Sequence, residues 1–139
     1  RMSVGGAGLG MAQAAFDAAL DYSKKRVQFG KPISTFQGIS FKIAEMATDI
    51  EAARLLVYKA ALLKDQESKD LSMEASMAKF FATEMAQRVI DQAVQIFGGL
   101  GVTKGNPVER LYREVRAIRI YEGTTEIQKL IIGNSLLRK

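Results

Sequence analysis

The sequence contains no cysteine, no histidine and no tryptophan, and only two of its 139 residues are proline. The lack of cysteine excludes disulfides and thiol nucleophiles, and gives no sign of an oxidising compartment. The lack of histidine as well excludes imidazole catalysis and a zinc site of the usual kind. We therefore predict no metal, and expect a cytoplasmic protein, or one of the mitochondrial matrix if the source is eukaryotic.

Long apolar runs are also missing: none reaches the length of a membrane span, and no signal peptide is visible. The chain is 47% hydrophobic and 25% charged, which is typical of a globular domain with one core. It begins at Arg1 without an initiator Met, and a helical pattern follows within a few residues. We therefore expect no membrane insertion and interpret residues 1–139 as one domain excised from a longer protein.

The charge is unbalanced towards the basic side, with a net charge of +5 and a pI of about 9.6. A basic surface can indicate nucleic acid, but aromatic residues are not interleaved with the charges here. Arg113, Arg116 and Arg119 are spaced to line one helix face, which favours a solvated face over a DNA-reading one. Attraction to an anionic cofactor or substrate, such as a phosphate-rich nucleotide, is a third interpretation. We predict no nucleic-acid partner.

Apolar periodicity predicts five helices and no sustained strand. The polar run 65–70 marks a surface connection, and the Phe, Met and Ile stripes are typical of a plain core. The fold class is therefore all-α: an antiparallel, up-and-down bundle, four-helix-bundle-like, with three long and two shorter helices. The helices are expected over about 7–26, 35–64, 71–97, 107–120 and 124–137.

Three helix starts carry capping signals. Asn106, followed by Pro107 and an acid in the first turn, is a strong start signal. Ser34 with Gln37, and Thr125 with Gln128, have the spacing of capping boxes.

Three irregular segments combine glycine with polar residues: 26–33 (RVQFGKPI), 95–101 (QIFGGLG) and 121–128 (YEGTTEIQ). Glycine at the end of a helix is usually only a cap, although a double glycine also lets another molecule approach the backbone closely. Arg26 could pair with a phosphate in bidentate fashion. Glu122 lies on a short glycine turn just ahead of a helix, which suits a group that must be aimed at a substrate, but most such carboxylates are solvated charges.

Taken together and in this order, the segments resemble the C-terminal helical domain of the acyl-CoA dehydrogenase family. The resemblance covers nearly the whole chain and rests on R-x-x-F-G-K-x-I from Arg26, Q-I-F-G-G-x-G from Gln95, and R-(D/E)-x-(R/K)-x-x-x-I-Y-E-G-T-x-E-I-Q from Arg113. The departures are small: Glu114 replaces the commoner Asp, and Val102 an aromatic residue. The resemblance implies that a helical domain and a β-barrel domain, both absent from this chain, complete the enzyme.

The resemblance further implies an FAD enzyme that oxidises an acyl-CoA thioester. A carboxylate removes the α-proton, the β-hydrogen leaves as hydride to the flavin, and a trans-2-enoyl thioester forms. Electrons then pass to an electron-transfer flavoprotein. Glu122 matches the family's base, and burial of a carboxylate between flavin and acyl chain would raise its pKa. Its backbone N–H helps hold the thioester oxygen, so Tyr121, Glu122 and Gly123 are the expected substrate contacts.

The expected FAD contacts fall into two groups. Thr124 and Glu126 match positions that face the flavin or its nucleotide end. The others match contacts to the FAD of a neighbouring subunit in a homotetramer, a dimer of dimers: Arg26, Gln28, Phe29, Gln95, Gly98, Gly99 and, more weakly, Gln37. The first and third helices of an antiparallel bundle run in parallel, so we expect the loops that follow them to meet at one end.

Two alternatives stay open. An oxidase or monooxygenase could use the same bundle, but such relatives often lack the glutamate found at position 122. A non-catalytic helical interaction module would show clustered basic charge without the three glycine motifs.

Overall fold

The computed structural model describes residues 1–69 and 71–138. Of the predicted connection 65–70, the structure describes residues 65–69, and Asp70 lies outside the described residues. The prediction of three long and two shorter helices is confirmed. The helices are α1 (Met2–Lys25), α2 (Gln37–Asp65), α3 (Leu71–Phe97), α4 (Pro107–Ile118) and α5 (Thr125–Leu137).

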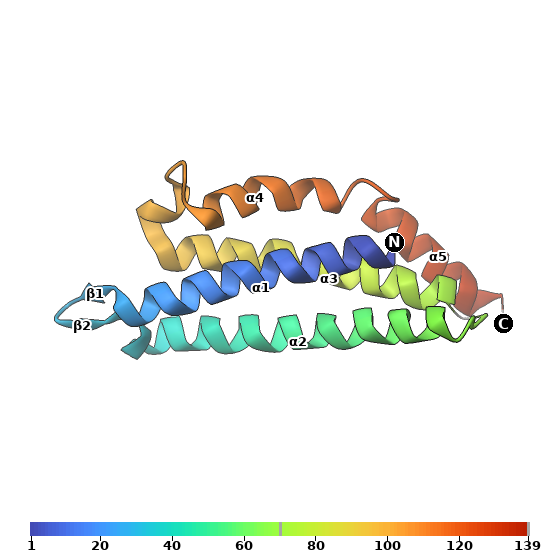
Figure 1. The fold of residues 1–139 in the computed structure, drawn as a ribbon, viewed down its shortest axis with the longest axis horizontal. Helices are drawn as coiled ribbons and strands as arrows, with labels where there is room; N and C mark the ends of the chain where they lie inside the picture. Colours follow the sequence, from blue (N-terminus) through green and yellow to red (C-terminus); the bar gives the residue numbers. More distant parts are fainter. Residues whose placement is uncertain (70, 139) are drawn as a thin grey trace.

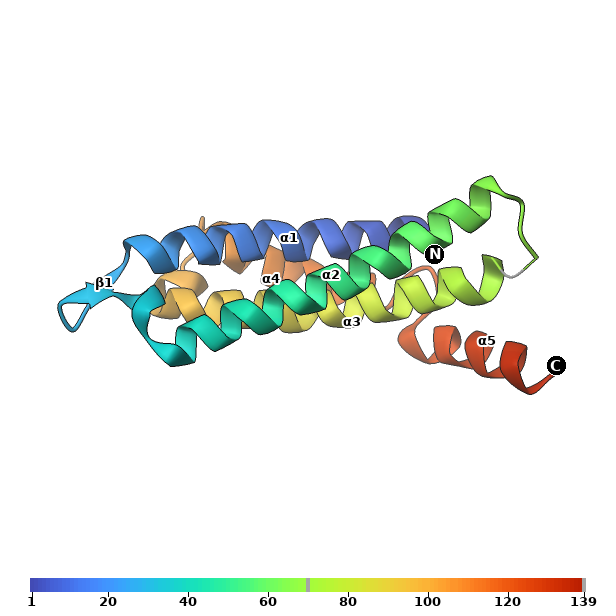
Figure 2. The same ribbon diagram turned by 90° about the horizontal axis from the view of Figure 1, so that it is seen from below.

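The helices form the predicted antiparallel bundle. Helices α1 and α3 run in one direction and α2 and α4 in the other (Figure 1). Helix α5 lies against the first part of α3 and extends beyond the end of the bundle that carries the N-terminus (Figure 2). The segment between α4 and α5 is therefore at that same end.

Helix α3 is the centre of the packing, since it contacts each of the other four helices. Its contact with α1 is close because small residues face each other. A Cβ atom added at Gly5 would lie 3.2 Å from the carbonyl oxygen of Ala78, and one added at Gly8 would lie 3.1 Å from that of Ala82. The two helices also bury six alanine side chains completely: Ala12, Ala15 and Ala19 of α1, and Ala78, Ala82 and Ala86 of α3.

Two local elements differ from the sequence expectations. Strands β1 (Val27–Gln28) and β2 (Lys31–Pro32) form a short antiparallel hairpin, which is too short to show alternation in the sequence. Its turn residues Phe29 and Gly30 both have positive φ, as two-residue hairpin turns require. Helix α1 also starts at Met2 rather than near residue 7, because its glycines hide the apolar periodicity.

The cap at Asn106 is confirmed: its side-chain oxygen accepts a hydrogen bond of 3.0 Å from the Val108 N–H. The capping box at Ser34 and Gln37 is wrong, because Ser34 lies in the short 3-10 helix η1 (Ile33–Thr35) and α2 follows Phe36 without a side-chain cap.

The box at Thr125 and Gln128 is also wrong. The cap of α5 is Thr124, which accepts from the Ile127 N–H. The side chains of Thr125 and Gln128 have other partners, described below. After α3 a second 3-10 helix, η2 (Gly98–Val102), leads towards α4.

Candidate functional site

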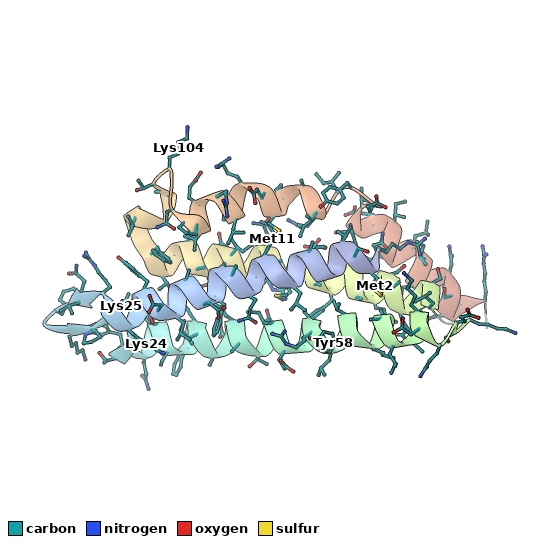
Figure 3. All side chains as sticks on the ribbon, in the orientation of Figure 1. Met2, Met11, Lys24, Lys25, Tyr58 and Lys104 are labelled. Carbon is teal, nitrogen blue, oxygen red and sulfur yellow. The ribbon has the colours of Figure 1, made fainter. Side chains whose placement is uncertain are left out.

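The predicted site residues lie at opposite ends of the bundle. The loop after α1 and the glycines after α3 share one end, as expected, where the rings of Tyr22 and Phe97 stack with centroids 4.3 Å apart. Figure 3 marks this end by Lys24 and Lys25 and the other by Met2. At a rise of roughly 1.5 Å per residue, α3 spans about 27 Å between Lys79, beside the predicted base, and Phe97.

Residues 119–124 connect α4 to α5, and the part from Tyr121 to Thr124 carries the predicted base. Glu122 has a φ of 56°, in the left-handed region, and Gly123 has a φ of 89°. The side chain of Glu122 is exposed. A left-handed conformation at a residue with a Cβ costs about 1–2 kcal/mol, so contacts from elsewhere must hold the segment in this shape.

Two buried side chains supply such contacts. Lys79 of α3 is completely buried, and its Nζ donates a hydrogen bond of 2.6 Å to the Gly123 carbonyl oxygen. The Nε2 of Gln128, also completely buried, donates to the same oxygen at 3.0 Å and to the Glu122 carbonyl at 3.3 Å. Burial lowers the pKa of Lys79, while the negative charges of Glu84, Glu122 and Glu126 act in the opposite direction.

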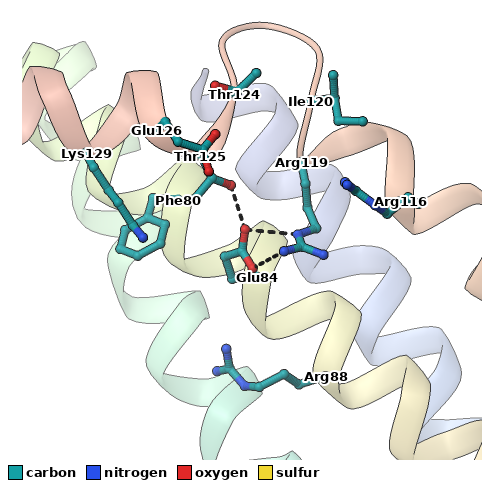
Figure 4. A pocket seen from close by; sticks show the side chains of 10 residues that line it. All are labelled: Phe80, Glu84, Arg88, Arg116, Arg119, Ile120, Thr124, Thr125, Glu126 and Lys129. Carbon is teal, nitrogen blue, oxygen red and sulfur yellow. Dashed lines mark hydrogen bonds and ion pairs between the residues drawn. The ribbon is translucent and has the colours of Figure 1, made fainter.

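Glu84 of α3 joins the two ends of this connection (Figure 4). Its Oε1 accepts from Arg119 Nε at 2.9 Å and from Thr125 Oγ1 at 2.6 Å, and its Oε2 lies 2.7 Å from Arg119 Nη2. Burial alone would raise the pKa of Glu84, but the hydrogen bonds from Arg119 and Thr125 hold it below the usual value. Arg119 follows α4 directly and Thr125 opens α5.

A cavity of about 400 Å³ lies beside this ion pair. Thr124 and Glu126, two predicted FAD contacts, line it, and Figure 4 shows basic side chains from α3, α4 and α5 around it. Its basic residues are Arg88, Arg116, Arg119 and Lys129. The prediction of a solvated arginine face is therefore wrong for Arg119, which is half-buried and paired. A group that carries negative charge, such as a phosphate, fits this lining.

The other end presents a different donor set. The ring of Phe29 is 91% exposed, and Arg26, Gln28, Gln37 and Gln95 are exposed as well. A Cβ atom added at either glycine of the pair Gly98 and Gly99 would meet nothing within 4 Å, so the backbone there is open to approach. An exposed guanidinium, amides, an aromatic ring and bare backbone suit the phosphates and base of a nucleotide.

Sequence reasoning missed the side chains that hold the 121–124 segment. Lys79 did carry a signal, because it stands at helical spacing among the alanines of the buried α3 stripe, where an unpaired charge would be costly. The pairing of Glu84 with Arg119 had no signal in the sequence, since it depends on where the C-terminal end of α4 lies relative to α3.

The described residues contain no group of three or more acidic side chains placed to hold a metal ion. Within residues 1–69 and 71–138, no helix combines the length and apolar character needed to cross a membrane.

The profile of the family described as "Acyl-CoA dehydrogenase, C-terminal domain" matches residues 1–137. The chain therefore belongs to the acyl-CoA dehydrogenase family, and the predicted family membership is confirmed. It is 50% identical over 139 residues to "Caffeyl-CoA reductase-Etf complex subunit CarC" of Acetobacterium woodii, covering 100% of this chain and 36% of that protein.

Solved structures agree with this assignment. Butyryl-CoA dehydrogenase from Megasphaera elsdenii superposes with a TM-score of 0.97 at 49% identity, over 99% of this chain and 36% of that one. A structure described as "FAD complex of PigA" superposes with a TM-score of 0.89 at 34% identity, over 95% of this chain and 34% of that one. The chain thus spans about a third of the length of these relatives.

Proposed function

We propose that this chain is the C-terminal helical domain of an FAD-dependent acyl-CoA dehydrogenase and supplies its catalytic base, Glu122. The observation that carries the proposal is the 121–124 segment. Its exposed carboxylate belongs to a residue with left-handed backbone, and Lys79 and Gln128 donate hydrogen bonds to the carbonyl groups of the segment. Such anchoring fixes a reactive group without covering it.

In this proposal the carboxylate of Glu122 removes the α-proton of the acyl thioester. The backbone N–H of Glu122 donates to the thioester oxygen and stabilises the negative charge that develops there. Tyr121 and Gly123 flank the same position and shape the contact with the substrate. A bound FAD would supply the acceptor for the hydride that leaves the β-carbon, so that a trans-2-enoyl thioester would remain.

The residues present fit FAD at both ends of the bundle. Thr124 and Glu126 line the basic cavity, which suits a phosphate-bearing part of the cofactor. The exposed loop residues Arg26, Gln28 and Phe29, together with Gln37, Gln95, Gly98 and Gly99, suit the nucleotide portion of a second FAD, held by a neighbouring subunit. Residues about 27 Å apart along α3 would then serve different cofactor molecules.

The proposed assembly is a homotetramer built as a dimer of dimers. A cofactor that is held by two subunits requires at least the dimer. An electron-transfer flavoprotein is the proposed redox partner, supported by the relative whose name places it in an Etf complex. The missing N-terminal helical and β-barrel domains would complete the flavin and acyl sites. We place the enzyme in the cytoplasm, or in the mitochondrial matrix of a eukaryote.

The direction of the reaction has a second candidate. The relative from Acetobacterium woodii is named a reductase, and by microscopic reversibility the same carboxylate can return a proton to the α-carbon of an enoyl thioester. The residues of this domain serve both directions, and the redox partner would set which one dominates.

Glu122→Gln in the full-length protein tests the assignment of the base. It should bind flavin and acyl-CoA normally but lose flavin reduction by several orders of magnitude, because a neutral amide cannot take the α-proton. Anaerobic stopped-flow mixing with a panel of straight and branched acyl-CoAs measures the bleaching of the flavin band. Near-normal bleaching in the variant would refute the assignment.

A further inference from the structure

The least expected feature of the bundle is a lysine with no exposed surface beside the proposed base. Lys79 lies on the face of α3 that packs against α1, where Gly5 brings the α1 backbone close to it. Burying an ammonium group is costly unless it is paired or hydrogen-bonded. Its Nζ donates a hydrogen bond to the carbonyl oxygen of Gly123, the residue directly after the proposed base.

We propose that Lys79 is a positioning residue: its buried ammonium group fixes the Gly123 carbonyl on α3 and thereby aims the Glu122 carboxylate at the substrate. The proposal rests on the proposed function, in which Glu122 is the base. In this role the Lys79 side chain does not touch the substrate; it keeps the 121–124 segment in its left-handed conformation.

The geometry supports this role in two ways. First, Gly123 has a φ of 89° and a Cβ there would lie 2.6 Å from Gln128 Nε2, so the peptide is tightly enclosed and can be fixed by one strong donor. Second, Lys79 is part of a rigid helix, so the peptide is tied to the core rather than to a mobile loop.

The charge of Lys79 adds an electrostatic effect. Three carboxylates act on the ammonium: Glu84 on its own helix, Glu122 on the connection and Glu126 on α5. These charges favour the protonated form of Lys79, so the hydrogen bond to the Gly123 carbonyl is charge-assisted.

The test is Lys79→Met in the full-length holoenzyme, which keeps the volume and removes the donor and the charge. Amide hydrogen exchange over residues 121–124 should become about tenfold faster or more, because a charge-assisted hydrogen bond is lost. Flavin reduction by a good acyl-CoA should fall about a hundredfold with little change in substrate affinity.

Lys59→Met is the matched control. Lys59 of α2 pairs with Glu74 of α3 at 3.0 Å, so its loss disturbs the same bundle without touching the 121–124 segment. If this control reproduces the faster exchange over residues 121–124 and the loss of flavin reduction, Lys79 acts only through stability and the proposal is wrong. The proposal is also wrong if Lys79→Met folds and leaves both exchange and reduction unchanged.

Lys79→Gln provides a second variant should Lys79→Met fail to fold. Its shorter, neutral amide weakens the hydrogen bond to the Gly123 carbonyl, so exchange over residues 121–124 should accelerate by a smaller factor; unchanged exchange would overturn the proposal. Failure of the proposed function is distinguishable from this. If none of the acyl-CoAs tested reduces the flavin of the wild-type holoenzyme, but Lys79→Met still accelerates exchange, the positioning role stands and the dehydrogenase assignment is wrong.

Discussion

Glu84 and Arg119 pair through both carboxylate oxygens, with Nε to Oε1 at 2.9 Å and Nη2 to Oε2 at 2.7 Å. Arg119 directly follows α4, and Oε1 of Glu84 also accepts from Thr125 at the start of α5. This one carboxylate therefore ties together the two ends of the connection that carries Glu122. Loss of this pair should therefore lower the free energy of unfolding and also disturb the position of the proposed base.

Glu84→Gln should lower the free energy of unfolding by about 1 kcal/mol, a value reduced for the partial exposure of both side chains. Urea denaturation of the full-length holoenzyme, followed by circular dichroism, measures the change. Asp21→Asn is the control, because Asp21 pairs with Lys25 on the surface of α1 and should contribute little. Equal effects of the two variants would contradict a special role for Glu84.

The same pair predicts a pH dependence. The pKa of Glu84 is lowered in the folded protein, so its contribution is fully present above the ordinary carboxyl pKa of about 4.3 and is lost as pH falls through the folded value. The stability difference between wild type and Glu84→Gln should thus be constant near neutrality and shrink in acid. Urea titrations at several pH values below 5 measure it; a difference that grows in acid would contradict the assignment.

Gly123→Ala should lower stability by about 2 kcal/mol and impair flavin reduction. Its φ of 89° disfavours any side chain, and the new Cβ would press on Gln128 Nε2 at 2.6 Å. Gly133→Ala is a close control, because Gly133 lies in α5 with open space around its Cβ position. That change should leave stability equal or raise it by about 0.5–1 kcal/mol. Thermal unfolding of both variants separates the two cases.

Arg26→Ala should weaken retention of FAD more than it reduces catalysis per bound flavin, because the proposed charge pair between Arg26 and the pyrophosphate would be lost. Flavin titration of the apoprotein, combined with turnover normalised to bound flavin, measures both quantities.

Mixed oligomers sharpen this prediction. Subunits with Arg26→Ala and subunits with Glu122→Gln, inactive separately at limiting FAD, should recover some activity when mixed. The flavin held by an intact Arg26 then belongs to the partner with an intact Glu122. Absence of recovery at every FAD concentration would show that the cofactor is not shared between subunits.

The isolated domain, residues 1–139, should be helical, inactive and unable to hold FAD tightly. Large apolar side chains exposed on α2 and α5 should make it self-associate; they are Phe41, Leu55, Tyr58, Leu62, Ile127, Leu130, Leu136 and Leu137. Size-exclusion chromatography and flavin titration check this. A monomer that binds FAD with submicromolar affinity would contradict it.

The helices and their order followed from the sequence because apolar periodicity and the break at Asn106 and Pro107 report burial and capping directly. The sequence did not predict which threonine caps α5, because Thr124 and Thr125 are adjacent and have the same side chain. Thr124 caps the helix, while Thr125 donates instead to Glu84 of α3.

The motifs pointed to the loops that present Arg26, Gln95 and Glu122. Periodicity places Lys79 on the buried stripe of α3 but does not reveal its partner, and Gln128 is an ordinary surface residue type that only the tertiary packing encloses. Support of this kind depends on contacts between residues far apart in the sequence, such as the one between α3 and Gly123.

Because one uninterrupted helix links the two ends, α3 fixes their relative orientation as well as their separation. Each residue of an α-helix turns the chain by about 100° and advances it by about 1.5 Å. Deleting a single residue between Glu84 and Phe97 would rotate the whole Gly98 end about the helix axis relative to Glu122. Insertions and deletions should therefore be excluded from α3, where even one would put the two ends that carry the proposed site residues out of phase.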